Sequence, residues 1–201
     1  MNKLDLLFVV DVTGSMGNFI SDAQHRMKGI LDDLTKEYEL DMRVGLSLYR
    51  DHPPQDNSFA TATYKLSKID DIKIIIDQIT VDGGGDIPEC VLDGIYDGVT
   101  NAKWRKNSKR VAFLIGDAPV HGMMSQEDCC QCGMVWGTAV EALESNEVTL
   151  YSILLSSNVE AQDHFRKLAI YSGGTFIKAT DAIAAIFNTL KTELEDYIIK
   201  R

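Results

Sequence analysis

Short apolar runs alternate with segments of helical period along almost the whole chain, and this alternation restricts the fold more than any other feature. From Leu4 to Val10 every residue except Asp5 is apolar, and this run ends at Asp11, as expected of a strand buried on both faces. Apolar residues then recur at every third or fourth position from Met16 to Tyr38, which predicts a long amphipathic helix. Similar pairs of segments follow, down to a last helix that ends near Ile199.

Such alternation predicts an α/β fold of three layers, a doubly wound and mostly parallel sheet with helices on both faces. A strand at Met42 to Tyr49 is followed closely by another at Phe59 to Lys65. The gap is too short for a crossover helix, so these two strands should pair antiparallel. No repeat, low-complexity tract or linker interrupts the 201 residues, and we expect residues 1–201 to form a single domain.

The net charge and the cysteine positions limit which partners and which cellular compartment are expected. Twenty Lys and Arg against thirty Asp and Glu give a net charge of −10, which argues against nucleic acid or an anionic membrane as partner. No segment reaches the roughly 18 apolar residues of a membrane span. Three of the four cysteines crowd into one loop, a poor disulfide framework, so a reduced, cytoplasmic protein is expected.

Three polar clusters fall where predicted strands end or in the loops above them. The first is the alternation Asp11, Thr13, Ser15; the second is the stretch Gly83 to Glu89; the third is the pair Gly116-Asp117. In open parallel sheets, ligands bind outside the carboxyl ends of the strands. The clusters offer carboxylate and hydroxyl oxygens, which suit a hard cation such as Mg²⁺. Thr and Ser also cap helices, so the first motif alone would be weak; the three loops together favour a metal site.

The motif FVVDVTGSM after the first strand, with GGGDIPE and FLIGDAPVH downstream, resembles the von Willebrand factor A (VWA) domain family over roughly Lys3 to Ile199. The resemblance implies a doubly wound, Rossmann-like sheet with one antiparallel edge strand, in agreement with the alternation. It also implies a metal-ion-dependent adhesion site (MIDAS), whose D-x-[ST]-x-S motif is specific in this context. The run YRDHPP with GGGDIPE looks most like the subgroup found beside alpha-kinase domains and in small stand-alone bacterial proteins.

By that resemblance, the metal ligands would be Asp11, Thr13 and Ser15 from the first loop and Asp117 from the third. The second loop departs from the family pattern, which usually has a Thr ligand where this chain has Gly85-Asp86. Asp86 could reach the metal directly or through water, or Glu89 could substitute. The expected ion is Mg²⁺, with Mn²⁺ or Ca²⁺ as alternatives.

The function favoured by the sequence is a non-enzymatic, metal-dependent protein-binding module. An open coordination position would accept an Asp or Glu of a partner. The resemblance implies that this partner is usually another protein, and in bacteria often an assembly containing an AAA-class ATPase. One alternative is a haloacid-dehalogenase-like, Mg²⁺-dependent phosphatase, whose first Asp is a nucleophile. That chemistry needs a lysine near the phosphate, and none stands near Asp11 in the sequence. A second alternative is a VWA scaffold whose metal site is unused.

Other residues near these motifs are ambiguous. Asp51 ends the second strand and is either an acid beside the metal or an exposed turn residue; Arg50 and His52 are expected at the surface. The loop from His121 to Cys132 holds one His and three Cys, the ligand count of structural zinc at an unusual spacing. Thiols in a loop over the metal face are the favoured interpretation, with zinc and redox pairing as alternatives.

Overall fold

The computed structural model describes residues 2–84, 87–123 and 132–199. The strands are β1 (Asn2–Asp11), β2 (Leu40–Tyr49), β3 (Thr61–Ser67), β4 (Lys109–Gly116), β5 (Thr149–Leu154) and β6 (Phe176–Lys178). The helices are η1 (Gly14–Met16), α1 (Gly17–Asp22), η2 (Ala23–Met27), α2 (Lys28–Glu37), α3 (Ile69–Gln78), α4 (Val91–Asn101), α5 (Trp136–Ser145), α6 (Val159–Tyr171) and α7 (Ala182–Ile199). The alternation predicted from the sequence is therefore present.

The six strands form one sheet in the order β3-β2-β1-β4-β5-β6. Every neighbouring pair is parallel except β2 and β3, so β3 is an antiparallel edge strand. This confirms the predicted fold class. The chain winds outward from β1 in both directions, so the strand order reverses between β1 and β4, the place where such sheets bind ligands.

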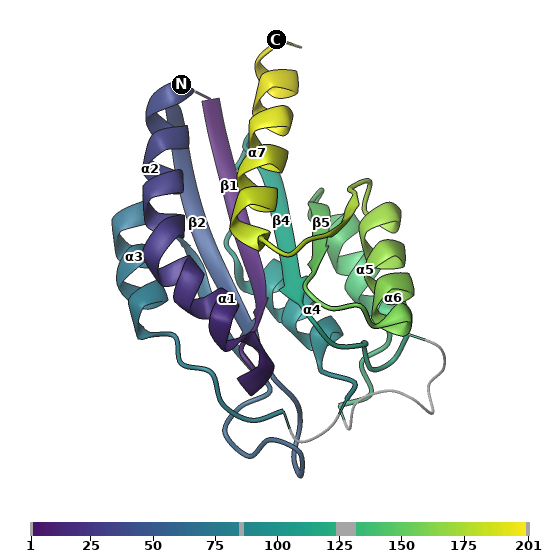
Figure 1. The fold of residues 1–201 in the computed structure, drawn as a ribbon. Coiled ribbons are helices and arrows are strands. Elements are labelled where there is room, and N and C mark those ends of the chain that lie inside the picture. The colour runs from purple at the N-terminus through teal and green to yellow at the C-terminus, as the bar shows by residue number, and fades with distance from the viewer. Residues whose placement is uncertain (1, 85–86, 124–131, 200–201) are drawn as a thin grey trace.

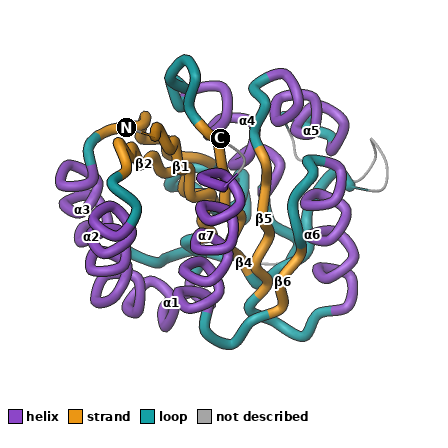
Figure 2. The backbone as a smooth tube through the Cα atoms, turned by 90° about the horizontal axis from the view of Figure 1, so that it is seen from above, coloured by secondary structure: helices purple, strands orange, loops and turns teal. Residues whose placement is uncertain are grey.

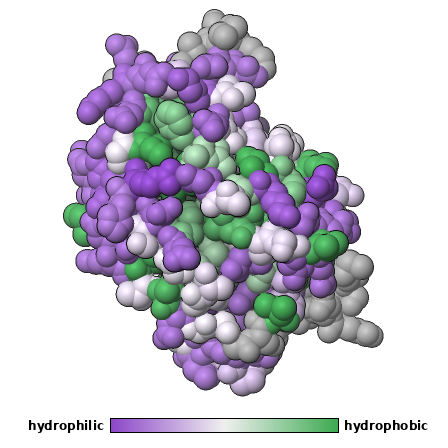
Figure 3. All heavy atoms as spheres, viewed as in Figure 1, coloured by the Kyte–Doolittle hydropathy of each residue, from purple (hydrophilic) through white to green (hydrophobic). Residues whose placement is uncertain are grey.

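Strand β1 is buried on both faces, as its apolar run predicts. Phe8 and its even-numbered neighbours pack against α1, α2, α3 and α7, whereas Leu7 and Val9 pack against α4, α5 and α6. Figure 2 shows these two groups of helices on opposite sides of the sheet. Figure 3 shows hydrophilic residues over most of the face seen in Figure 1, with hydrophobic side chains gathered in its middle. No helix in the described ranges is long and apolar enough to cross a membrane.

The first helical segment differs from the single helix predicted between Met16 and Tyr38. It begins with a 3₁₀ turn at Gly14, passes through α1, widens into a π turn from Ala23 to Met27 and continues as α2. Its apolar side still faces the sheet, with Leu31 and Leu34 fully buried. Its beginning follows directly from the end of β1, which places Thr13 and Ser15 at the sheet edge.

The loops that follow β1, β2 and β4 gather at the end of the molecule opposite both chain termini (Figure 1). Backbone hydrogen bonds join each of these loops to the segment between α3 and α4. Gly14 donates to Gly83, Glu89 donates to Pro119, and Cys90 donates to Arg50, at 3.2, 2.9 and 3.0 Å. The polar clusters seen in the sequence are therefore held at one place by main-chain contacts.

Candidate metal-binding site

The first loop builds its own hydrogen-bonded frame around the Asp11 carboxylate. Thr13 donates to Asp11 Oδ1 from its backbone N–H at 2.8 Å and from Oγ1 at 2.6 Å. The hydroxyls of Thr13 and Ser15 lie 3.2 Å apart. Asp11 and Thr13 are buried, whereas Ser15 is exposed. The alternating spacing thus directs one carboxylate and two hydroxyls to the same small region.

The second loop approaches the first through glycines. Gly84 has φ +83°, which favours glycine, and a Cβ there would lie 3.1 Å from Thr13 Cβ. The same hypothetical Cβ would lie 3.5 Å from Glu89 Oε1, so the Glu89 carboxyl group is close to this turn. Glu89 is buried, and its backbone is fixed by the bond to Pro119 and by a bond from His121. The other predicted second-loop ligand, Asp86, lies outside the described residues.

The third loop adds Asp117, which follows the end of β4. Asp117 is half-buried and lines a pocket of about 510 Å³ at the carboxyl edge of the sheet. Thr13, Ser15 and Glu89 line the same pocket. Asp11 lies beneath it, fully buried at the end of β1. The structure therefore brings together four of the five predicted ligands, Asp11, Thr13, Ser15 and Asp117.

Part of this pocket was not anticipated from the sequence. Its remaining wall is formed by Ser156, Ser157 and Asn158, which follow β5 and precede α6. Asn158 caps α6 by accepting a hydrogen bond from the Ala161 N–H at 3.0 Å. These residues could have been predicted from the sequence, because a Ser-Ser-Asn run directly after an apolar strand lies at the same sheet edge as Asp11 and Asp117.

Burial and the neighbouring negative charges disfavour the ionised forms of groups in this site. The pKa of Asp11 is raised from 3.8 to about 7, chiefly because the group is buried and in smaller part because of the charge of Asp117, while the hydrogen bonds from Thr13 partly offset this rise. Burial, followed by the charges of Asp11, Glu89 and Asp117, also raises the pKa of Tyr49 well above its usual value. Asp11 Oδ2 is buried and has no hydrogen-bond partner among the described residues. A cation beside these groups would supply the missing compensation, and the oxygen donors suit a hard divalent ion.

Two expectations for the loop after β2 are wrong in part. Arg50, expected at the surface, is buried: it donates to Ser58 and to the Thr80 carbonyl, and its side chain lies 3.6 Å from Asp56. These partners come from the loops that fold back over the guanidinium group. Asp51 is not an exposed turn residue, because it is buried and accepts hydrogen bonds from the His52 N–H and the Cys90 thiol. His52 is half-buried and does not line the pocket of Asp117.

Residues 5–181 match the family described as von Willebrand factor A domain. Alpha-protein kinase vwkA of Dictyostelium discoideum is 35% identical over 120 residues, 59% of this chain and 19% of the kinase. The putative ariadne-like RING finger protein R811 of Acanthamoeba polyphaga mimivirus is 23% identical over 205 residues, 94% of this chain and 20% of that protein. The chain thus spans about a fifth of the length of these curated relatives.

Solved structures share the fold at low sequence identity. The pilus adhesin SpaC of Lactobacillus rhamnosus GG, in an open conformation, has a TM-score of 0.67 at 12% identity, covering 96% of this chain and 30% of the adhesin. Proximal thread matrix protein 1 of the mussel byssus, with a zinc-occupied MIDAS motif, has a TM-score of 0.60 at 16% identity. That match covers 97% of this chain and 44% of the matrix protein.

Proposed function

Because this chain belongs to the von Willebrand factor A domain family, as the match over residues 5–181 shows, we propose that it is a metal-dependent protein-binding module. Asp11, Thr13, Ser15 and Asp117 would hold one divalent cation of the Mg²⁺ or Mn²⁺ class. A bound cation supplies an electrophilic position that a carboxylate of a partner protein can ligate. The zinc-occupied MIDAS of the mussel thread protein is a precedent on the same fold.

The observation that carries the proposal is the unsatisfied, buried Asp11 Oδ2 beside an open, oxygen-lined pocket. The hydroxyls of Thr13 and Ser15 add ligand atoms without adding charge. Glu89 is the acid that the described second loop brings to the same pocket, and it is the candidate for the role that the family usually gives to a Thr.

The pocket also favours binding over phosphoryl transfer. None of the described residues that line it is a lysine or arginine, so no side chain there neutralises a transferring phosphoryl group. We therefore propose that the chain is not a phosphatase. An assay with an aryl phosphate and Mg²⁺ tests this directly, because turnover that disappears in Asp11→Asn would establish the enzymatic alternative.

Metal binding is tested by calorimetric titration of the metal-free protein with Mn²⁺ or Mg²⁺. We expect one ion per chain and loss of that binding in Thr13→Ala, which removes a hydroxyl but leaves every charge in place. Thr192→Ala is the matched control, because Thr192 lies on α7 and donates only to the Asn188 carbonyl one helical turn away. Equal affinity in Thr13→Ala and Thr192→Ala would place the ion elsewhere.

Partner binding is tested by capture with the parent and both variants, with and without EDTA. The carboxylate-ligation proposal requires that EDTA and Thr13→Ala each abolish capture and that Mg²⁺ or Mn²⁺ restore it to the parent. An AAA-class ATPase assembly is the first partner to test. A partner captured equally well without metal would move the interface away from this pocket.

A further inference from the structure

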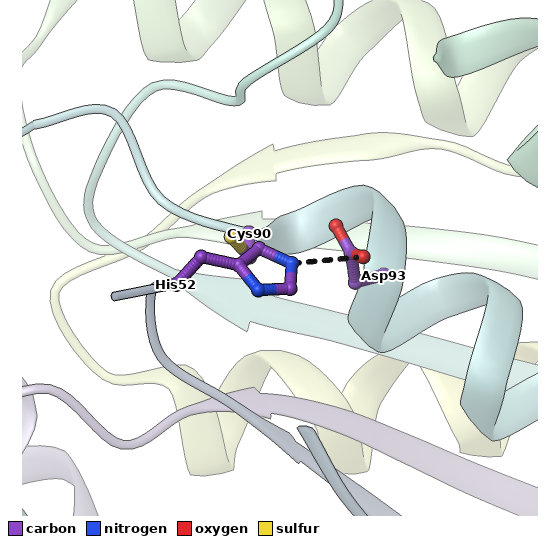
Figure 4. Close-up of side chains that lie close together, drawn as sticks. All are labelled: His52, Cys90 and Asp93. Carbon is purple, nitrogen blue, oxygen red and sulfur yellow. Dashed lines mark hydrogen bonds and ion pairs between the residues drawn. The ribbon is translucent and has the colours of Figure 1, made fainter. Parts of the chain in front are cut away.

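A second group of potential metal ligands lies where the end of β2 meets the start of α4, and none of its members lines the pocket described above. One ligand atom each from His52, Cys90 and Asp93 lies within 4.8 Å of the others. His52 Nε2 is 3.3 Å from Asp93 Oδ1. Figure 4 shows the imidazole of His52, from the loop after β2, turned toward the start of α4, where Cys90 is the N-cap residue and Asp93 lies in the first turn. Imidazole, thiol and carboxylate therefore meet at one point.

A fourth ligand comes from the segment that precedes α5. The Cys132 thiol donates to the same Asp93 Oδ1 atom at 2.9 Å. Cys132 is exposed, whereas Cys90 is fully buried and Asp93 is 7% exposed. The four side chains come from three separate segments of the chain, so their meeting is a result of the tertiary structure.

Two buried carboxylates, Asp93 of this cluster and the neighbouring Asp51, lack some of the interactions, among the described residues, that would compensate their negative charge. Asp93 Oδ2 and Asp51 Oδ2 are buried and lack hydrogen-bond partners within the described ranges. Asp51 is 2% exposed, and its other oxygen accepts from Cys90 Sγ at 3.0 Å and lies 3.7 Å from His121 Nε2. Buried carboxylates are stabilised by a nearby cation or by full hydrogen bonding, and here hydrogen bonding is incomplete. The two acids thus indicate that a cation binds among these side chains.

We propose that His52, Cys90, Asp93 and Cys132 bind one zinc-class ion, at a site separate from the pocket of Asp11 and Asp117. Two thiolates and an imidazole select zinc over Mg²⁺, which prefers oxygen ligands alone. Zinc–ligand bonds of 2.0 to 2.3 Å place the ligand atoms of a tetrahedron roughly 3.3–3.8 Å apart. The observed spacing, at most 4.8 Å among three of the ligands, needs only small side-chain rotations to close. On binding, Cys90 and Cys132 release their thiol protons to solvent.

The backbone around the cluster is already fixed. Cys90 N–H donates to the Arg50 carbonyl, and His121 N–H donates to the Glu89 carbonyl, at 3.0 and 3.2 Å. Asp51, which contacts Cys90 and lies near His121, would act as the outer carboxylate that orients ligands. An ion here would tie the segment before α5 to α4 beside Glu89, and so stiffen the second loop of the first pocket.

The site is tested with Co²⁺ alone as the probe, added to the metal-free, reduced chain of 201 residues. Thiolate ligation gives a sulfur-to-cobalt charge-transfer band in the near ultraviolet, which oxygen ligands cannot produce. We expect this band in the parent and its displacement by one equivalent of Zn²⁺. It should persist in Thr13→Ala, which impairs only the first pocket, and in His25→Gln, which changes an exposed helical histidine.

Cys132→Ser and His52→Gln should weaken zinc binding at least ~100-fold, because loss of even an outer-shell partner costs roughly 10–100-fold. Cys132 is exposed and His52 half-buried, so both variants should keep the parent's far-ultraviolet circular dichroism. Cobalt binding to the parent without the thiolate band would overturn the proposal. So would zinc affinity in these two variants equal to that of the parent.

Discussion

Replacing Asp11 by Asn should make the metal-free protein more stable at pH 8 and less stable at pH 4. The amide oxygen of Asn can keep both hydrogen bonds that Thr13 donates to Asp11 Oδ1. Its NH₂ group takes the position of Oδ2, which is buried and has no partner among the described residues. The substitution therefore removes a buried negative charge and introduces an unsatisfied donor, and the two effects oppose each other.

The magnitude follows from the pKa of Asp11. The unfolded chain ionises this group near 3.8 and the folded chain near 7, so the folded state holds the extra proton between these values. Stability of the parent therefore falls as pH rises from 4 to 7, and above pH 7 the penalty is complete, about 4 kcal/mol. Asn does not titrate. Its unsatisfied NH₂ costs about 1–3 kcal/mol at every pH, which leaves the variant ahead by roughly 1–3 kcal/mol at pH 8.

The assay is urea unfolding of parent and Asp11→Asn at pH 4, 5, 6, 7 and 8 in EDTA, repeated with saturating Mg²⁺ above pH 6. Taking the difference in the free energy of unfolding between the two proteins cancels the contribution of all other titrating groups. In EDTA, this difference in the free energy of unfolding should change by about 4 kcal/mol in favour of the variant between pH 4 and pH 8. With Mg²⁺ the parent should gain about 2.7 kcal/mol at 100 times its Kd, and the variant less. A difference that stays constant with pH would refute the assigned burial of the Asp11 charge.

Three further substitutions test the packing that positions the site. Gly98→Ala on α4 should cost about 1–3 kcal/mol in urea unfolding, because its Cβ would lie 2.7 Å from Ser47 Cβ on β2. Gly29→Ala on α2 has open space around its Cβ and should instead stabilise by about 0.5–1 kcal/mol; equal effects would refute the packing argument. Asp5→Ala should cost about 1–3 kcal/mol, because the backbone N–H and Nε of Arg105 lose the fully buried Asp5 as acceptor, although the guanidinium keeps its ion pair with Asp41. A loss below 1 kcal/mol would show that Arg105 finds other partners.

The sequence was sufficient for the layer architecture and the first loop. The apolar run of β1 predicts a strand buried on both faces, and its sheet partners β2 and β4 lie on either side of it. Local spacing also placed Asp11, Thr13 and Ser15 together, because residues two apart in a tight turn can face one point. Asp117 could be added from the sequence alone, since parallel strands end at the same sheet edge.

Only the tertiary structure decided the contacts made by the loops. The sequence predicts Arg50 at the surface and leaves Asp51 undecided between an acid beside the metal and an exposed turn residue, because nothing local shows that residues 50–60 fold back and bury both. The meeting of His52, Cys90, Asp93 and Cys132 joins three segments, and residues 52 and 132 are separated by two helices and two strands. Periodicity reports which face of an element is apolar, so it determined the sheet and helices. Polar contacts between loops depend on distances set by the whole folded chain, and no local pattern encodes them.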